Sequence, residues 1–217
     1  MCGRTILTLP DEELADLFAL IEFPKREARY NVAPSQPTAI IREPGKLELL
    51  RWGLILPNAK GANGINVRVE SVARVPAYRD SFRQRRCLVI VDGFYEWKHT
   101  GEKKRQPYLV RRTDRKAFAL AGIWDQSITK DGEVLETCAV ITGAAKEPVA
   151  SLHDRMPLIV APSDLGRWLD VDGDVSTLLN TNGTGLEAYP VSTMVNSPAV
   201  DDPRCLEREE PIQASLF

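Results

Sequence analysis

The second residue of the chain is a cysteine that can carry out chemistry closed to an internal cysteine. The sequence begins Met1-Cys2-Gly3-Arg4, and cysteine is small enough for an initiator methionine in front of it to be removed. Removal would leave an α-amine and a thiol on one residue. The amine can attack an aldehyde, and the thiol can then close the resulting imine into a ring. The alternative is that Cys2 is a buried thiol that only fills space. This chemistry also needs a proton donor, a base and an electrophile-binding group facing the terminus.

A carboxylate stands inside an aromatic segment at residues 92–98, DGFYEWK. Strand alternation places Phe94 and Glu96 on one face, with Tyr95 and Trp97 on the other. Apolar surroundings disfavour an ionised carboxylate, which suits Glu96 to act as a general acid or base. A salt bridge between Glu96 and one of the neighbouring arginines is the alternative.

A histidine and an asparagine complete the polar groups that could serve Cys2. His153 is one of two histidines; it follows an expected helix, precedes an expected strand, and can transfer protons near neutral pH. A hydrogen-bonded structural histidine is the alternative. Asn66 can both donate and accept hydrogen bonds, and Arg68 can bind a phosphate through two donors.

Basic residues are concentrated in one part of an otherwise acidic chain. Residues 68–116 contain 14 Lys and Arg against 6 Asp and Glu, although the net charge is −2. This asymmetry indicates an anion-facing surface, with solvated strand faces as the alternative. The residues that could form this surface are Arg4, Arg68, Arg74, Arg79, Arg83, Arg85 and Arg86, and the Trp52 ring could stack on an unstacked nucleic-acid base.

The hydrophobic pattern predicts many short strands with helices between them. Thr8 is the expected cap of a first helix that ends before Pro24, and residues 57–64 are expected to form a loop. The expected strands are 37–43, 46–52, 65–71, 86–91, 93–98, 107–112, 117–122, 137–142, 157–161 and 188–192. Further helices are expected at 72–83, 145–151, 163–169 and 174–180. The pattern predicts an α+β fold with a strongly bent, barrel-like, largely antiparallel sheet flanked by helices.

Length and composition narrow the class of protein. We expect one domain over residues 1–217 with a flexible tail from about 205. No apolar run approaches the ~20 residues that span a bilayer, and no signal sequence is present, so we expect a cytosolic monomer without a membrane partner. The four cysteines are dispersed and only two histidines are available, so we expect no metal, cofactor or disulfide.

Taken together, motifs along nearly the whole chain resemble one family. They are MCGR at 1–4, YNVAPSQ at 30–36, RWGL at 51–54, NVRVES at 66–71, RRCLVIVDGFYEWK at 85–98, LAGIWD at 120–125, LHDRMP at 152–157 and VSTMVNSP at 191–198. The pattern is similar to that of the SRAP family, the SOS response-associated peptidases or abasic-site processing proteins. Departures such as Val67 for the family's alanine, and Ile90-Val91 for its Pro-Ala, leave the four candidate reactive residues in place.

The resemblance implies a function and a role for each candidate residue. It implies that Cys2 forms a thiazolidine with the ring-opened aldehyde of an abasic site in single-stranded DNA, after the protein's own peptidase activity has released Met1. It also implies that Asn66 positions the sugar or the terminus, and that Glu96 and His153 transfer protons. A protein of this kind would be associated with the nucleoid.

Two other functions and one further partner stay open on the sequence alone. Class II glutamine amidotransferases also begin Met-Cys-Gly and would use the terminal thiol on an amide. A non-covalent single-strand binder would use Cys2 only for packing. The chain ends with Gln213-Ala214-Ser215-Leu216-Phe217, which resembles peptides that dock on the bacterial sliding clamp, with a frayed tail as the alternative.

Overall fold

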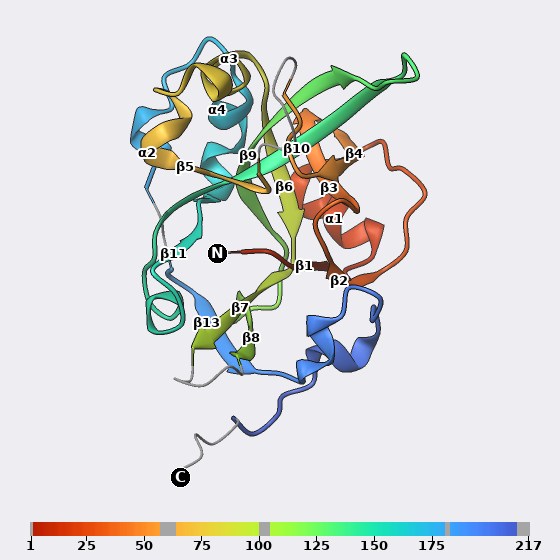
Figure 1. Cartoon of the computed structure of the whole chain (residues 1–217), viewed down its shortest axis with the longest axis vertical. Coiled ribbons are helices and arrows are strands. Elements are labelled where there is room, and N and C mark those ends of the chain that lie inside the picture. Colours follow the sequence, from red (N-terminus) through yellow and green to blue (C-terminus); the bar gives the residue numbers. More distant parts are fainter. Residues whose placement is uncertain (1, 57–63, 100–104, 181–182, 212–217) are drawn as a thin grey trace.

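The computed structural model describes residues 2–56, 64–99, 105–180 and 183–211. Strands dominate these parts of the chain (Figure 1). The strands are β1 (Thr5–Leu7), β2 (Arg29–Val32), β3 (Pro37–Glu43), β4 (Lys46–Trp52), β5 (Asn66–Arg68), β6 (Arg86–Val91), β7 (Gly93–His99), β8 (Arg105–Arg112), β9 (Phe118–Ile128), β10 (Val134–Ala144), β11 (Arg155–Pro157), β12 (Ile159–Val160) and β13 (Leu186–Pro190). The α-helices are α1 (Asp11–Phe18), α2 (Val69–Val72), α3 (Pro76–Gln84) and α4 (Leu165–Leu169). The 3₁₀ turns are η1 (Val149–Ser151), η2 (Pro162–Asp164), η3 (Ser176–Leu178), η4 (Thr193–Asn196) and η5 (Pro203–Leu206).

Five strands close into a barrel in the order β10-β4-β3-β6-β9, because β9 also pairs with β10. Four of these pairings are antiparallel, and β10 with β4 is parallel. The β3–β4 hairpin has the predicted bounds, and its turn needs Gly45, whose φ is +84°, a conformation that costs glycine little. The α+β fold with a bent, barrel-like sheet is confirmed.

Alternate side chains of the barrel strands fill two separate cores. Ile40, Val89, Leu120 and Val140 belong to a cluster that contains no α-helix residue, which makes it the inside of the barrel. The neighbouring positions pack against α1, α3 and α4 on the outside. Cys87 and Cys138 lie in the inner cluster and are fully buried. A closed barrel has no free edges, so its rim is a stable support for a site.

Two expected elements near the site have the expected type but the wrong bounds. The expected strand 65–71 ends at Arg68, and Glu70 lies in α2 instead. The expected helix 72–83 is divided, because α3 begins at Pro76, whose ring removes an N–H donor and suits the first helical position. The expected loop at 57–64 falls almost wholly outside the described residues.

Thr8 does not cap α1. The helix begins at Asp11 after Pro10 and has no side-chain cap, while the Thr8 hydroxyl donates to Asp92 Oδ2 at 2.6 Å. The main-chain N–H groups of Thr8 and Leu9 donate to the same oxygen at 2.8 and 3.1 Å. Asp92 precedes β7, so this bonding ties the segment after β1 to the strand that carries Glu96.

A second sheet, in the order β13-β8-β7-β1-β2, lies beside the barrel and holds the start of the chain. The first strand β1 lies between β7 and β2, near the middle of the molecule (Figure 1). One face of this sheet carries a small core that includes Ile6, Tyr95 and Tyr189. Among the described residues no helix is long and apolar enough to cross a membrane.

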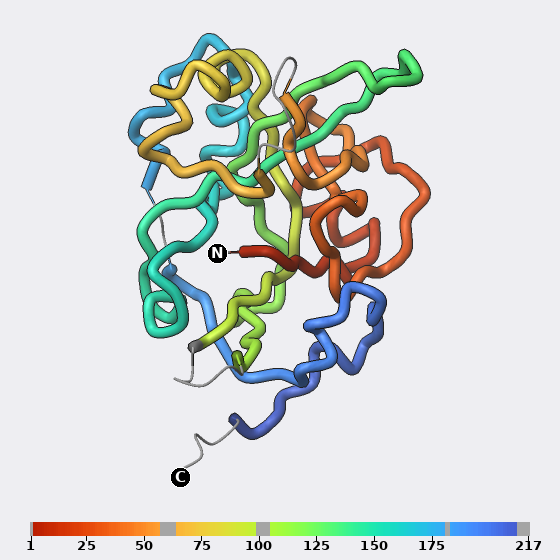
Figure 2. The backbone as a smooth tube through the Cα atoms, in the orientation of Figure 1, coloured from red at the N-terminus to blue at the C-terminus, as the bar shows by residue number. Residues whose placement is uncertain are grey.

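The C-terminal segment packs against this sheet, where a flexible tail from 205 was expected. Cys205 is fully buried, and its carbonyl accepts a hydrogen bond from the Tyr95 hydroxyl at 3.2 Å. The Tyr189 hydroxyl donates to Leu206 O at 3.0 Å, and Glu209 N donates to Pro190 O at 3.0 Å. Figure 2 shows this blue segment lying along the lower side of the molecule, next to the N-terminal strands. The chain is therefore held to at least Glu209.

Candidate functional site

The register of β1 against β7 brings Cys2 next to the strand that carries Glu96. Thr5 pairs with Phe94, and Tyr95 N donates to Arg4 O at 3.0 Å. Continuation of this antiparallel register places Gly3 opposite Glu96. The Cys2 side chain is fully buried in the core cluster that fills the barrel and also contains Phe94. Cys2 therefore sits between the inside of the barrel and the second sheet.

The carbonyl of Cys2 is held by Asn66. Asn66 Nδ2 donates to Cys2 O at 2.7 Å, and β5, which carries Asn66, is fixed by parallel pairing with Val140 in β10. Asn66 Oδ1 is buried and has no hydrogen-bond partner among the described residues. Because a buried amide oxygen without a partner is costly, this atom is suited to accept a hydrogen bond from a bound ligand. The expected positioning group therefore touches the expected nucleophile.

Glu96 is a buried carboxyl with an altered protonation equilibrium. It is 1% exposed, and desolvation raises its pKa from 4.5 to about 7. Phe94 and Glu96 face one side while Tyr95 and Trp97 pack in the core of the other, as the alternation predicted. A carboxyl with a pKa near neutrality is present in both forms at pH 7, so Glu96 can give or take a proton.

The Cys2 thiol is kept protonated by its surroundings. Burial is the main cause that raises its pKa far above the usual range, and the negative charge of Glu96 is the second. A standing thiolate is therefore disfavoured, and nucleophilic attack by sulfur needs a base that removes the proton during the reaction. The charge of Glu96 acts on the Cys2 thiol, so Glu96 is a candidate for this base.

His153 lies between η1 and β11, at the junction the sequence predicted. Its Nδ1 accepts the main-chain N–H of Arg155 at 3.0 Å and lies 2.7 Å from Asp154 Oδ1. The side chain is 24% exposed, and the charge of Asp154 also contributes to the raised pKa of Glu96, after desolvation. Nδ1 is therefore turned to its own loop, and the charge of the adjacent Asp154 reaches Glu96.

The candidate DNA contacts divide into exposed and buried groups. The exposed side chains belong to β5, α3 and the segment before α3 and are as follows: Arg68, Arg74, Arg79 and Arg83. Arg85 is partly buried and donates to Asp125 Oδ2 at 3.0 Å. Arg4 is also partly buried and donates through its terminal nitrogens to Gly3 O and Asn196 O, both at 3.2 Å.

Arg86 and Trp52 are not available to a DNA strand in this structure. Arg86 is 5% exposed and donates to the carbonyls of Trp168 and Phe82 at 2.7 and 3.1 Å, and to that of Asp170. Trp52 is 1% exposed and donates from Nε1 to Ile65 O at 2.9 Å. Both side chains hold neighbouring segments in place, so we leave them out of the DNA surface.

The sequence did not reveal two residues that hold the segments around the site, Arg155 and Asn196. Arg155 forms a two-pronged ion pair with Glu70, with both N–O distances at 2.9 Å, and donates to Thr142 O at 2.6 Å. Asn196 contacts both Arg4 and Trp97. Both residues lie in quoted motifs, HDRMP and VSTMVNSP, but single residue types gave no signal of their partners. Covariation with Glu70 and Trp97 is the signal that could have revealed them.

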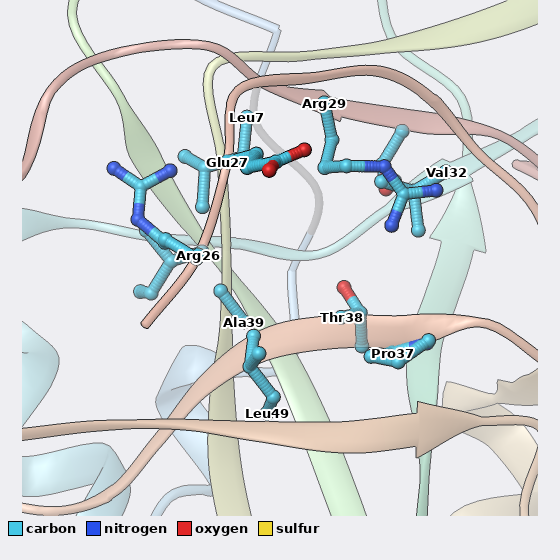
Figure 3. Close-up of a pocket in the computed structure, with 11 residues that line it drawn as sticks. Leu7, Arg26, Glu27, Arg29, Val32, Pro37, Thr38, Ala39 and Leu49 are labelled. Atoms are coloured by element: carbon cyan, nitrogen blue, oxygen red, sulfur yellow. The ribbon is translucent and has the colours of Figure 1, made fainter. Parts of the chain in front are cut away.

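A separate cavity of about 130 Å³ lies between β1, β2 and the outside of the barrel (Figure 3). Arg26 and Arg29 line it, together with apolar residues such as Leu7 and Val32. Both guanidinium groups are already engaged, Arg26 with Asp11 at 2.6 Å and Arg29 with Asp201. This cavity holds none of the four candidate reactive residues.

Comparison with known proteins identifies the family. The model of the family described as SOS response associated peptidase (SRAP) matches residues 1–198. The chain belongs to the SRAP family. The matched range contains all four candidate reactive residues.

Named relatives and solved structures agree with the SRAP assignment. The abasic site processing protein YoaM of Bacillus subtilis is 38% identical, covering 96% of this chain and 99% of that protein. The abasic site processing protein YedK of Escherichia coli is 27% identical over 91% of this chain and 95% of that protein. A crystal structure of a Bacteroides thetaiotaomicron protein has a TM-score of 0.85 at 22% identity, covering 96% of this chain and 100% of that one, which supports the fold.

Proposed function

We propose that this SRAP protein processes abasic sites in single-stranded DNA by forming a covalent bond through Cys2. The observation that carries the proposal is the meeting of three groups at the start of the chain. Asn66 binds the Cys2 carbonyl at 2.7 Å, and the charge of Glu96 acts on the Cys2 thiol. The names of the relatives, abasic site processing proteins, supply the electrophile, since an abasic sugar opens to an aldehyde.

The proposed reaction forms a five-membered thiazolidine ring and releases one water. The α-amine of Cys2, once Met1 has been released, adds to C1′ of the aldehyde and water leaves to give an imine. The sulfur then bonds to the same carbon, and the thiol proton ends on the ring nitrogen. An α-amine titrates at roughly 7.7–8.0, so a reactive neutral fraction exists near pH 7. Met1 itself lies outside the described residues.

The roles of the proton carriers follow from their surroundings. Glu96, with a pKa of about 7, removes the proton from the buried thiol as the ring closes and returns it to nitrogen. His153 is assigned to protonate the sugar ring oxygen as the aldehyde opens. Asn66 holds the terminus through one end of its amide and offers Oδ1 to the sugar. Self-cleavage of the Met1–Cys2 bond is a further proposed activity of the same groups.

The exposed arginines of β5, α3 and the segment before α3 give the proposed DNA path. Arg68, Arg74, Arg79 and Arg83 are exposed, and contacts from such residues to phosphates do not depend on base sequence. A buried terminus cannot reach a sugar within a stacked duplex, which favours single strands. The proposed clamp-binding peptide at residues 213–217 lies outside the described residues, and loss of clamp binding on its deletion is the test.

The deciding experiment is a denaturing gel of the protein incubated with an oligonucleotide that contains one abasic site. A slower band is expected with the wild-type protein and not with Cys2→Ala, while Cys205→Ala is the matched control because its thiol lies in a different core. No band from wild-type protein whose Met1 is confirmed absent by mass spectrometry rules out the proposal. Glutaminase activity without a slower band would favour an amidotransferase. Unchanged DNA interactions in Cys2→Ala would favour a non-covalent binder.

A further inference from the structure

The residue Asn196, at the end of η4, contacts two side chains that flank the candidate site. Its Oδ1 accepts a hydrogen bond from Trp97 Nε1 at 2.7 Å. Its main-chain carbonyl accepts one from Arg4 Nη2 at 3.2 Å. Trp97 follows Glu96 in β7, and Arg4 lies two residues after Cys2. One residue from the C-terminal part of the chain therefore connects β7 with the segment before β1.

The position of Asn196 is itself fixed by a buried amide. Asn31 is fully buried, and its Nδ2 donates to the carbonyls of Val195, Ser197 and Val200 at 3.2, 3.0 and 2.7 Å. Two of these carbonyls belong to the residues on either side of Asn196. Because a buried donor shared among several carbonyls is costly to displace, the turn around Asn196 has little freedom to move.

Arg4 carries a positive charge that the described part of the protein does not neutralise. Its hydrogen bonds go to the carbonyls of Gly3 and Asn196, and its Nε is buried with no partner among the described residues. Burial lowers the Arg4 pKa, with no carboxylate acting against that shift. An oriented guanidinium whose terminal nitrogens each keep a further N–H donor is suited to bind a phosphate oxygen.

Trp97 presents an indole ring whose polar edge is already bound. Its side chain is partly buried and packs at the edge of the core that contains Tyr95, with ring centroids 6.4 Å apart. The bond to Asn196 fixes the rotation of the ring about its side-chain torsions. Trp97 points to the face of β7 opposite to that of Glu96. Its fixed, partly exposed ring can stack on a base of a DNA strand that runs past the end of β7, and such stacking is worth about 1–3 kcal/mol per base.

We infer that Asn196 is a positioning residue that orients Trp97 toward the DNA strand and, with its carbonyl, Arg4. This inference rests on the proposed function, since it assigns a role in holding the DNA beside the reacting sugar. Asn196 touches no reacting atom in this arrangement. Its loss should therefore weaken DNA binding and leave the reactivity of Cys2 itself intact.

The test separates DNA binding from Cys2 chemistry in the full-length protein. Binding is measured with a single-stranded oligonucleotide that carries a tetrahydrofuran, an abasic analogue without an aldehyde. Chemistry is measured as thiazolidine formation with acetaldehyde, followed by mass spectrometry. Asn196→Ala should weaken oligonucleotide binding about fivefold, the effect of one lost hydrogen bond, and change the acetaldehyde rate by less than about twofold. Thr193→Ala, an exposed position in the same turn, is the matched control.

A double-mutant cycle with Trp97→Phe shows whether Asn196 acts through the indole. Phenylalanine lacks the Nε1 donor, so Asn196→Ala should cost little or nothing further in that background, and the two effects should be clearly non-additive. If Asn196→Ala does not fold, Trp97→Phe is tested by itself, and it should weaken oligonucleotide binding without changing the acetaldehyde rate.

The outcomes for Asn196 and for the proposed function are distinguishable. Three results would each overturn the role of Asn196. The Asn196→Ala variant could bind the oligonucleotide as tightly as the wild type, or its effect could add to that of Trp97→Phe in the cycle. Its reactivity with acetaldehyde could also fall by the same factor as its oligonucleotide binding. Failure of wild-type protein to form the crosslink with an abasic oligonucleotide overturns the proposed function instead. Tetrahydrofuran binding continues to report on Asn196 in that case.

Discussion

The side-chain amide of Asn66 donates a hydrogen bond to the main-chain carbonyl of Cys2 at 2.7 Å. The two residues are 64 positions apart in the chain, and they meet because β5 runs parallel to β10 at the rim of the barrel. The bond orients the terminal residue without consuming its amine or thiol. It also leaves Asn66 Oδ1 buried and without a hydrogen-bond partner among the described residues.

Asn66→Asp should slow crosslinking at least about tenfold with little change in tetrahydrofuran-oligonucleotide binding. The substitution places a carboxylate oxygen against the Cys2 carbonyl, so the bond is lost and two acceptors face each other. Crosslink formation under single-turnover conditions measures the rate. Asn180→Asp, an exposed position with no contact to Cys2, is the control, and a normal rate in Asn66→Asp would remove Asn66 from the site.

Glu96→Gln should make the protein more stable at pH 8 while slowing the crosslink. The Glu96 pKa is about 7 in the folded state against an ordinary value of 4.5, so between these values the folded protein holds a proton that the unfolded chain has released. Stability therefore falls as pH rises through this window, by on the order of 3 kcal/mol in full. Glutamine has no charge to desolvate, and urea unfolding at pH 5 and pH 8 measures the difference.

The same variant tests the role of Glu96 in ring closure. Wild-type crosslinking should rise with pH through about 7 as Glu96 becomes available as a base, and Glu96→Gln should lose that step. The α-amine titrates somewhat higher and should still contribute its own rise. A Glu96→Gln profile that matches the wild type in shape would assign the step to another group.

Asp154→Asn should reduce crosslinking about threefold. His153 Nδ1 accepts the Arg155 N–H at 3.0 Å and lies 2.7 Å from Asp154 Oδ1, and these two contacts hold the orientation of the ring. Asparagine keeps the size of the side chain but weakens the second contact, so the imidazole is held less firmly in its place. Single-turnover crosslinking measures the rate, and an equal reduction in the exposed Asp172→Asn would contradict this role.

The sequence predicted those parts of the fold that depend on local pattern. The β3–β4 hairpin and β6 have the expected bounds, because alternation and the Pro44-Gly45 turn act within a few residues. Thr8 shows where local pattern fails: a threonine before an acidic turn reads as a helix cap, yet its hydroxyl bonds to Asp92, 84 residues away. No local signal describes that distant acceptor.

In the candidate site too, the sequence predicted the reactive residue types but not the contacts that distant residues make. Residue chemistry and motif order identified Cys2, Asn66, Glu96 and His153, and the structure brings Asn66 and Glu96 to Cys2. The exposure of each arginine could not be predicted, because the sequence does not show whether a guanidinium faces solvent or binds main-chain carbonyls. Arg86 binds carbonyls, because the loop after α4 passes directly over the start of β6.

Arg86→Ala should destabilise the fold by about 3 kcal/mol or more and act on DNA binding only through unfolding. Arg86 donates to the carbonyls of Phe82, Trp168 and Asp170, and its loss leaves these buried acceptors without partners. The neighbouring exposed Arg83→Ala should stay within about 0.5 kcal/mol of the wild type in urea unfolding. Normal stability of Arg86→Ala together with weakened DNA binding would return this residue to the DNA surface.

Arg68→Ala should weaken binding to single-stranded DNA and reduce its dependence on salt. Arg68 is exposed at the end of β5, two residues after Asn66, so its guanidinium is placed to neutralise a phosphate near the reacting sugar. Each such contact contributes about −0.7 to the slope of log K against log salt concentration for a single strand. The slope of Arg68→Ala should be shallower by roughly that amount, whereas the exposed Lys130→Ala in the β9–β10 hairpin should retain the wild-type slope. Weaker binding with an unchanged slope would mean that Arg68 acts through the protein and not through a phosphate.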